Sequence, residues 1–254
     1  MNRKYIRSSF SLFKFLFIMS AITDHLQTVR TRVFQAAQQA HRDPSSVNLL
    51  AVSKTQPVSA ILEAAEAGQL AFGENYEQEA VRKILAIRQE RPDLKLQWHF
   101  IGPIQSNKTR AIAEYFDWVH SVDRERIARR LSDQRPANMP PLNICLQVNI
   151  SGENSKSGVR PEELADLAKA VSGMPRLKLR GLMAIPEPQS DPEKQRQPFN
   201  AMKILFERLR KAGYDLDTLS MGMSDDMEAA VQEGATTVRI GTAIFGQRHY
   251  PEKR

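Results

Sequence analysis

The sequence contains almost no cysteine. Cys145 is the one cysteine among 254 residues, so the chain cannot form an internal disulfide or a zinc site built on several thiolates. It lies in an apolar run, where we interpret it as a small buried side chain in a reducing, cytoplasmic compartment rather than a nucleophile. Histidine is also sparse, and without metal-ligand spacing we expect no metal site; the five are His25, His41, His99, His120 and His249.

A membrane-spanning stretch is missing as well. The apolar run at 10–18 is interrupted by Lys14, whereas a spanning helix needs ~20 apolar residues. With the basic residues before it, the run resembles a signal peptide, but no convincing cleavage motif of small residues follows. We favour a third interpretation, in which Met19 is the start and residues 1–18 are an extension that is disordered or not translated. Residues 19–254 then form one domain.

The excess of positive charge is modest once this extension is set apart. The formal charge is +7, from 36 basic and 29 acidic residues, and the extension supplies four basic residues and no acid. No block of lysine and arginine with interleaved aromatics stands out in the remainder. We therefore expect no nucleic-acid partner. The motifs G-x-G-x-x-G and G-x-S-x-G are missing too, and each G-x-x-x-x-G stretch lacks the lysine of a phosphate-binding P-loop.

Short apolar runs alternate with helix-period stretches along the rest of the chain. Near-continuous apolar strands separated by helices favour a parallel sheet covered by helices, and eight of them favour a closed (β/α)₈ TIM barrel of the α/β class. The strands are expected at 47–53, 70–73, 98–101, 118–121, 143–150, 177–185, 218–221 and 237–240. The helices are expected at 24–41, 57–67, 76–89, 106–116, 123–134, 161–171, 192–212 and 225–232, with Ser106, Asp123 and Asp225 near N-caps and Pro161 and Pro192 in first turns.

Chemistry in such a barrel belongs at the carboxyl ends of the strands. Lys54 follows the first strand directly, before a polar turn and Pro57. A lysine held there can serve as a partly desolvated nucleophile or form a Schiff base, although a solvated lysine at a strand end is the commoner situation.

The loops after the seventh and eighth strands are the usual phosphate site of this architecture. Ser224 and Thr242 supply hydroxyl donors there, and Gly241 allows the backbone to approach an anion closely. Ser224 could equally be a simple helix cap. Arg239 stands in the otherwise apolar last strand, so it needs a buried partner, either a carboxylate or a ligand atom such as a ring nitrogen.

Several stretches together resemble the pyridoxal phosphate homeostasis protein family, single-domain relatives of the alanine racemase N-terminal barrel. The resemblance extends from about residue 21 to residue 250. The motifs that carry it are 51–54 (AVSK), 72–76 (FGENY), 98–102 (WHFIG), 105–108 (QSNK), 181–183 (GLM), 221–226 (MGMSDD) and 239–246 (RIGTAIFG).

The resemblance implies an alanine racemase-like barrel that binds the vitamin B6 coenzyme pyridoxal 5′-phosphate (PLP). Lys54 would hold PLP as an internal aldimine and Arg239 would approach the pyridine nitrogen. The other implied cofactor-binding residues are Asn75 and Met223, which would line the pocket, and Ser224, Gly241 and Thr242, which would bind the phosphate.

The same resemblance implies a cytoplasmic carrier or buffer of PLP without strong catalysis. Racemases of this fold use a second base from a separate domain across a dimer, and only eight residues follow Gly246. Tyr76, His99 and Lys156 are unassigned candidates for that base, so a weak amino-acid racemase is one alternative. A PLP-free scaffold is another. Partners would be PLP and, as recipients, PLP-dependent apo-enzymes, and the chain would be a monomer or weak dimer.

Overall fold

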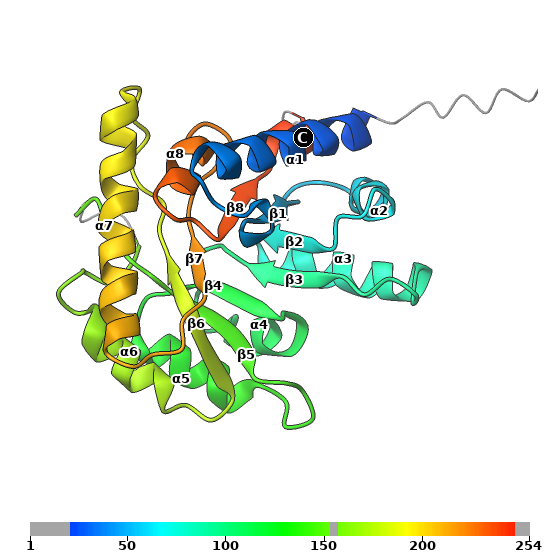
Figure 1. Ribbon diagram of the computed structural model, residues 1–254. Coiled ribbons are helices and arrows are strands. Elements are labelled where there is room, and N and C mark those ends of the chain that lie inside the picture. The colour runs from blue at the N-terminus through cyan, green and yellow to red at the C-terminus, as the bar shows by residue number, and fades with distance from the viewer. Residues whose placement is uncertain (1–20, 153–156, 247–254) are drawn as a thin grey trace, which may run out of the picture.

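Parallel strands close into a barrel in which each strand pairs with its neighbour in sequence and β1 pairs with β8 (Figure 1). The computed structural model describes residues 21–152 and 157–246. The strands in this part of the chain are β1 (Asn48–Val52), β2 (Ala71–Glu74), β3 (Gln97–Phe100), β4 (Trp118–Val122), β5 (Leu142–Gln147), β6 (Leu177–Met183), β7 (Thr218–Ser220) and β8 (Thr237–Ile240). The predicted (β/α)₈ barrel is therefore confirmed.

The strands form where the sequence is apolar because both of their faces are covered. Every residue of β4 and of β8 is buried, as expected for parallel strands between a barrel interior and a layer of helices. Closure places Leu50 opposite Arg239 in the pairing of β1 with β8. The fifth and sixth strands end three and two residues before their predicted ends, at Gln147 and Met183.

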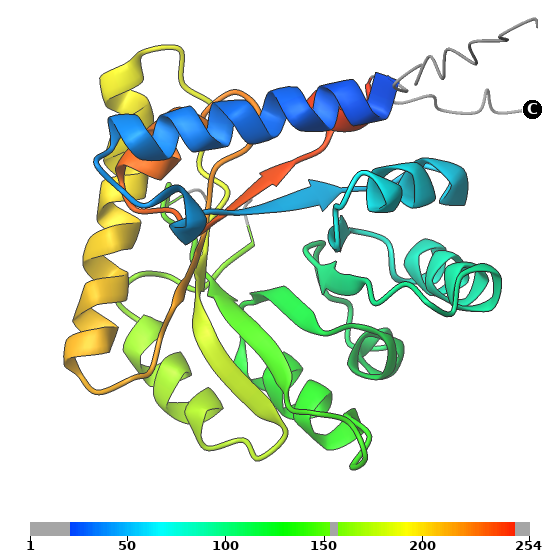
Figure 2. The ribbon, with the colours of Figure 1, turned by 45° about the vertical axis from the view of Figure 1, so that its right-hand side comes forward.

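Helices follow the strands and pack around them (Figures 1 and 2). The described helices are α1 (Ala21–Gln39), α2 (Val58–Glu66), α3 (Glu77–Glu90), α4 (Thr109–Tyr115), α5 (Glu125–Gln134), α6 (Leu164–Ser172), α7 (Pro192–Lys211), α8 (Met227–Gln232) and α9 (Thr242–Phe245), with a 3₁₀ turn at Pro44–Ser46. The short α9 and the 3₁₀ turn were not predicted. Helix α1 precedes the first strand and packs against α2, α8 and α9.

Several predicted helix starts were too early. Lys108, Arg124 and Asp226 occupy the N-cap positions of α4, α5 and α8 without a side-chain capping bond. Turns at 161–163 delay α6 until residue 164. By contrast, α7 begins at Pro192 after an Asp191 cap, whose carboxylate accepts the N–H of Glu193.

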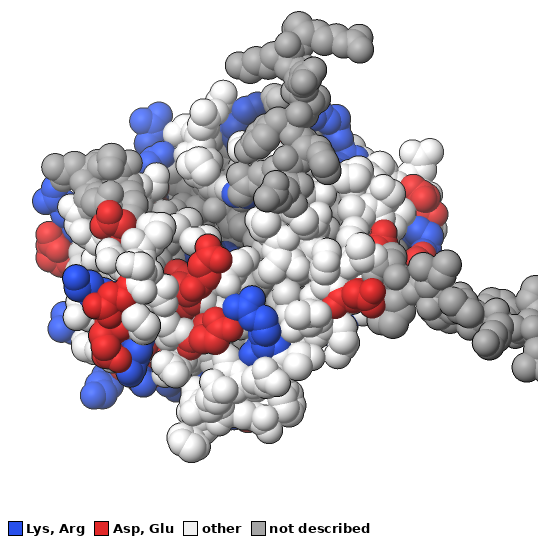
Figure 3. Space-filling view, turned by 90° about the horizontal axis from the view of Figure 1, so that it is seen from above, with Lys and Arg blue, Asp and Glu red and all other residues white. Residues whose placement is uncertain are grey.

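The apolar core lies mainly between the ring of strands and the helices, and it contains the large buried side chains of Phe72, Phe116 and Phe199. The barrel interior is more polar, as described below. Among the described helices, none is long and apolar enough to cross a membrane. On the face seen from above, basic and acidic side chains are interspersed rather than gathered in a patch of one sign (Figure 3).

Candidate functional site

A cavity of about 500 Å³ opens at the carboxyl ends of the strands. The seven residues predicted as a cofactor site all line it; they are Lys54, Asn75, Met223, Ser224, Arg239, Gly241 and Thr242. They come from loops after β1, β2, β7 and β8 and from β8 itself, and barrel closure brings these segments together. Its size falls within the ~300–1,000 Å³ typical of small-molecule sites.

Lys54 reaches this cavity from a tight turn that directly follows β1. The N–H of Gln56 donates to the carbonyl of Ser53 at 3.0 Å, and the residue between Lys54 and Gln56, Thr55, has a φ of +65°. A β-branched residue is rarely found in this left-handed region, so surrounding contacts must hold it. The Lys54 side chain is half-buried. An amine in this setting is partly removed from water, which favours a nucleophilic lysine.

Arg239 of β8 also lines the cavity and is 4% exposed. Its guanidinium donates to the hydroxyl of Ser220 at 2.8 Å and to the carbonyl of Ala184 at 2.9 Å. Among the described residues, no carboxylate is within ion-pair distance of it. Burial lowers the pKa of Arg239 to about 10, and the charge of Asp226 opposes that shift. The residue thus remains a cation, held by neutral groups, beside the cavity.

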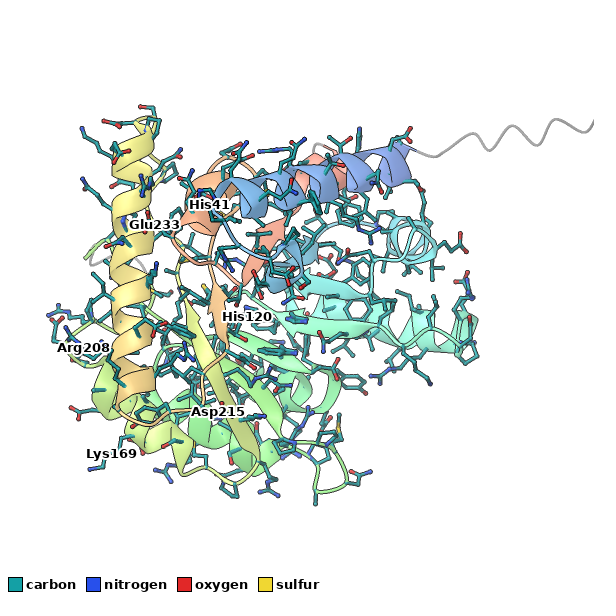
Figure 4. All side chains as sticks on the ribbon, in the orientation of Figure 1. His41, His120, Lys169, Arg208, Asp215 and Glu233 are labelled. Atoms are coloured by element: carbon teal, nitrogen blue, oxygen red, sulfur yellow. The ribbon has the colours of Figure 1, made fainter. Side chains whose placement is uncertain are left out.

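Ser220 continues the contact into the interior of the barrel. Its hydroxyl lies 2.8 Å from Nδ1 of His120. The other ring nitrogen of His120, Nε2, lies 2.9 Å from Nδ1 of His99. Nε2 of His99 in turn lies 2.9 Å from Oε1 of Gln97. Figure 4 shows His120 among the strands, whereas the labelled Lys169 and Arg208 lie on outer helices. This chain runs through β8, β7, β4 and β3.

The direction of each bond in this chain follows from the amide oxygen of Gln97. Oε1 of Gln97 can only accept, so His99 donates to it from Nε2, and in the neutral ring Nδ1 of His99 accepts from Nε2 of His120. Nδ1 of the neutral His120 then accepts the hydrogen of the Ser220 hydroxyl, which itself accepts from the Arg239 guanidinium. Burial lowers the pKa of His99 to about 3 and that of His120 well below its ordinary value, with the charges of His99 and Arg239 adding to the latter shift. Both rings are neutral.

The loop after β2 supplies Asn75, whose Oδ1 is buried and has no hydrogen-bond partner among the residues that the structure describes. Gly102 in the neighbouring loop allows this arrangement, because a Cβ on it would lie 2.2 Å from the Asn75 carbonyl oxygen. An unsatisfied buried amide oxygen is costly. At the edge of a cavity it indicates a position where a ligand can donate a hydrogen bond.

The loops after β7 and β8 line the cavity on the β8 side of Lys54, because β8 pairs directly with β1. Ser224 is half-buried and Thr242 exposed, and the cap position of α8 belongs to Asp226, so Ser224 is not the simple cap considered above. The carboxylate of Asp226 accepts the N–H of Met223 at 2.5 Å and fixes the loop. A Cβ on Gly241 would lie 3.1 Å from the Val52 carbonyl oxygen. Glycine therefore lets this turn lie against β1.

The comparisons with known proteins place the chain in a family. Residues 25–249 match the family described as "Alanine racemase, N-terminal domain". The pyridoxal phosphate homeostasis protein of Pseudomonas aeruginosa is 60% identical over 232 residues, covering 91% of this chain and 98% of the relative. That of Escherichia coli K12 is 56% identical over 235 residues, covering 92% of this chain and all of the relative.

The chain belongs to the pyridoxal phosphate homeostasis protein family. Among solved structures, PipY of Synechococcus elongatus with PLP bound is 35% identical, with a TM-score of 0.75 over 89% of this chain and all of that one. Alanine racemase of Corynebacterium glutamicum shares the fold alone, at 16% identity and a TM-score of 0.64, over 92% of this chain and 63% of that one.

In this member of the family, two of the three candidates for a second base, Tyr76 and His99, do not line the cavity. Tyr76 is 53% exposed at the start of α3 and does not line it. His99 lines a different cavity, of about 750 Å³, at the amino-terminal ends of the strands. It is buried and its ring nitrogens bond to His120 and Gln97. Lys156, and residues 1–18, lie outside the described residues.

Sequence reasoning missed Arg32, which reaches the cavity from α1. Its guanidinium donates to the Ser224 carbonyl at 3.2 Å and pairs with Glu228 of α8 at 2.8 Å. This places a cation beside the Ser224 loop. No local pattern indicated it, because its partner is 196 positions away in the sequence. Gln56, Asp225 and Ala243 also line the cavity and belong to loops that the strand-end argument had already singled out.

Proposed function

We propose that this chain binds pyridoxal 5′-phosphate at Lys54 and takes part in PLP homeostasis as a carrier or buffer of the cofactor. Its membership of the pyridoxal phosphate homeostasis protein family supports this, as does the PLP bound by the related PipY. The observation that supports the named residues is that all seven of the predicted residues line one cavity.

The residues present fit the chemistry of this cofactor. When bound, PLP supplies an aldehyde that condenses reversibly with a primary amine, next to a heteroaromatic ring and a phosphate. Lys54 is the half-buried amine on one wall. Ser224 and Thr242, in the loops after β7 and β8, offer hydroxyl donors for an anion, and the Arg32 guanidinium lies near Ser224. Asn75, whose Oδ1 has no partner among the described residues, follows β2, on the other side of β1 from these hydroxyls.

Arg239 determines what kind of site this is. Its guanidinium is charged and can donate but not accept, so a ring nitrogen facing it receives a hydrogen bond and is not protonated. An unprotonated ring withdraws electrons less and stabilises a carbanion less. The chain through Ser220 and His120 fixes the guanidinium from behind. This arrangement favours holding the cofactor over activating it for chemistry on amino acids.

We propose that catalysis is weak or missing for a second reason. Racemisation needs an acid–base group on each face of the substrate carbon. Tyr76 does not line the cavity and His99 is buried in the barrel interior, where burial lowers its pKa to about 3. The cytoplasmic location, the monomeric or weakly dimeric state, the transfer of PLP to apo-enzymes and the division at residue 18 remain parts of this proposal.

The test is an absorbance titration of the purified chain with PLP. Wild-type protein should develop a visible band near 420 nm, which borohydride reduction bleaches while fixing the cofactor to a peptide that contains Lys54. Lys54→Ala should lose both the band and the labelled peptide but keep its far-UV circular dichroism. A band retained in Lys54→Ala, or label found on another lysine, would refute the assignment. Turnover of L- to D-amino acids that vanishes in Lys54→Ala would instead support the racemase alternative.

A further inference from the structure

A buried cluster of charged side chains lies directly behind Lys54. Lys83 of α3 donates to Glu74, at the end of β2, at 2.9 Å, and to Glu79, also on α3, at 2.5 Å. The side chains of Lys83 and Glu74 are 8% and 0% exposed, and that of Glu79 is 25% exposed. Two carboxylates therefore share one ammonium group, and none of the three groups lines the cofactor cavity.

The cluster holds the backbone on both sides of Lys54. On the preceding residue, the hydroxyl of Ser53 donates to Glu74 at 2.7 Å and its carbonyl accepts from Lys83 at 2.9 Å. On the following residue, the N–H of Thr55 donates to Oε1 of Glu79 at 2.6 Å. Glu79 thus binds Thr55 at its left-handed φ of +65°. Lys54 stands between two anchored residues.

Stability alone is a poor explanation of this arrangement. Burying a carboxylate costs free energy that an ion pair often only offsets, and apolar residues of similar volume stabilise such positions equally well. Burial raises the pKa of Glu74, opposed mainly by the charge of Lys83, and within the described part of the chain its Oε2 has no hydrogen-bond partner. What apolar residues could not do is accept the N–H of Thr55 or the hydroxyl of Ser53.

We propose that Glu79, together with Glu74 and Lys83, forms a positioning cluster that fixes the turn around Lys54 and aims its amine into the cavity. This inference rests on the proposed function for the role of the amine. The turn itself is a property of the cofactor-free chain. A residue with a strained backbone keeps that conformation only when surrounding contacts hold it. At Thr55, the hydrogen bond from its N–H to Glu79 is such a contact.

The experiment compares Glu79→Ala, Glu79→Gln and a matched control, Glu125→Ala. Glutamine keeps an oxygen that can accept the Thr55 N–H, whereas alanine removes it. Glu125 also belongs to an i,i+4 ion pair on a helix, with Arg129 of α5, but it is exposed and far along the chain. Two measurements are made on each protein: amide hydrogen exchange at Thr55 without cofactor, and the affinity for PLP from the absorbance titration. Thermal unfolding verifies that each variant is folded.

In Glu79→Ala, exchange at Thr55 should accelerate at least tenfold and the affinity for PLP should fall about tenfold, which corresponds to about 1.4 kcal/mol. Glu79→Gln should stay within about threefold of wild type on both measurements, and Glu125→Ala should match wild type. Unchanged exchange or unchanged affinity in Glu79→Ala would overturn the proposal, as would equal losses in the alanine and glutamine variants. Failure of wild-type protein to attach PLP would refute the proposed function instead, and the exchange measurement would still decide whether Glu79 holds the turn.

Discussion

The two neutral histidines inside the barrel should make the protein sensitive to acid. In the folded chain burial holds the pKa of His99 at about 3, against an ordinary value of 6.5. Below pH 6.5 the unfolded state therefore binds a proton on His99 that the folded state does not bind. The contribution of the neutral ring to the free energy of unfolding is fully present above pH 6.5 and is lost as the pH falls. At pH 5, which is 1.5 units below the unfolded value, His99 alone should lower the free energy of unfolding by about 2 kcal/mol, at about 1.36 kcal/mol per unit.

Urea denaturation of the cofactor-free protein at pH 8, 6.5 and 5 measures this loss. His99→Gln keeps a donor and an acceptor for His120 and Gln97 but does not titrate. Its stability should fall between pH 8 and pH 5 by about 2 kcal/mol less than that of wild type. The control is His41→Asn, since His41 is exposed and asparagine tolerates its φ of +54°. Parallel losses in wild type and His99→Gln would refute both the neutral ring and the bond directions that depend on it.

Two further predictions concern the anion wall. Ser224→Ala and Thr242→Val should each weaken binding of PLP roughly tenfold, because a hydrogen bond to a charged group is worth ~1.5–3 kcal/mol. Binding of pyridoxal, which has no phosphate, should not change in an isothermal titration, and equal losses for both compounds would contradict the phosphate assignment. Gly222→Ala should lower the free energy of unfolding by about 2–4 kcal/mol in urea melts, because its φ is +92° and a Cβ there would lie 2.6 Å from the Ala230 Cβ. If Gly222→Ala unfolded at the same urea concentration as wild type, the turn would have to accommodate the added Cβ without cost.

Much of the site could be predicted from sequence because a closed barrel has a simple rule. Parallel strands that alternate with helices place all their carboxyl ends on one face. Lys54, Asn75, Ser224 and Thr242 could thus be grouped without knowing any distance, and the structure places them around one cavity. Arg239 was noticed because a charge in an apolar strand needs a partner.

Helix starts were predicted less well, for a local reason. Asp225 and Asp226 are both good caps by composition, and their chemistry does not say which one begins α8. The structure assigns the cap position to Asp226, whose side chain instead accepts the N–H of Met223. The neighbouring loop therefore decides the boundary.

The sequence by itself determined the order of strands and helices, and through its family motifs the position of the lysine and of the anion loops. Only the tertiary structure decided what surrounds them. The partners of Arg239 proved to be a serine hydroxyl and a backbone carbonyl rather than a carboxylate, and the hold of Glu79 on Thr55 joins residues 24 positions apart. Periodicity reports which face of an element is buried, whereas the partner that a buried polar atom meets depends on how distant elements pack.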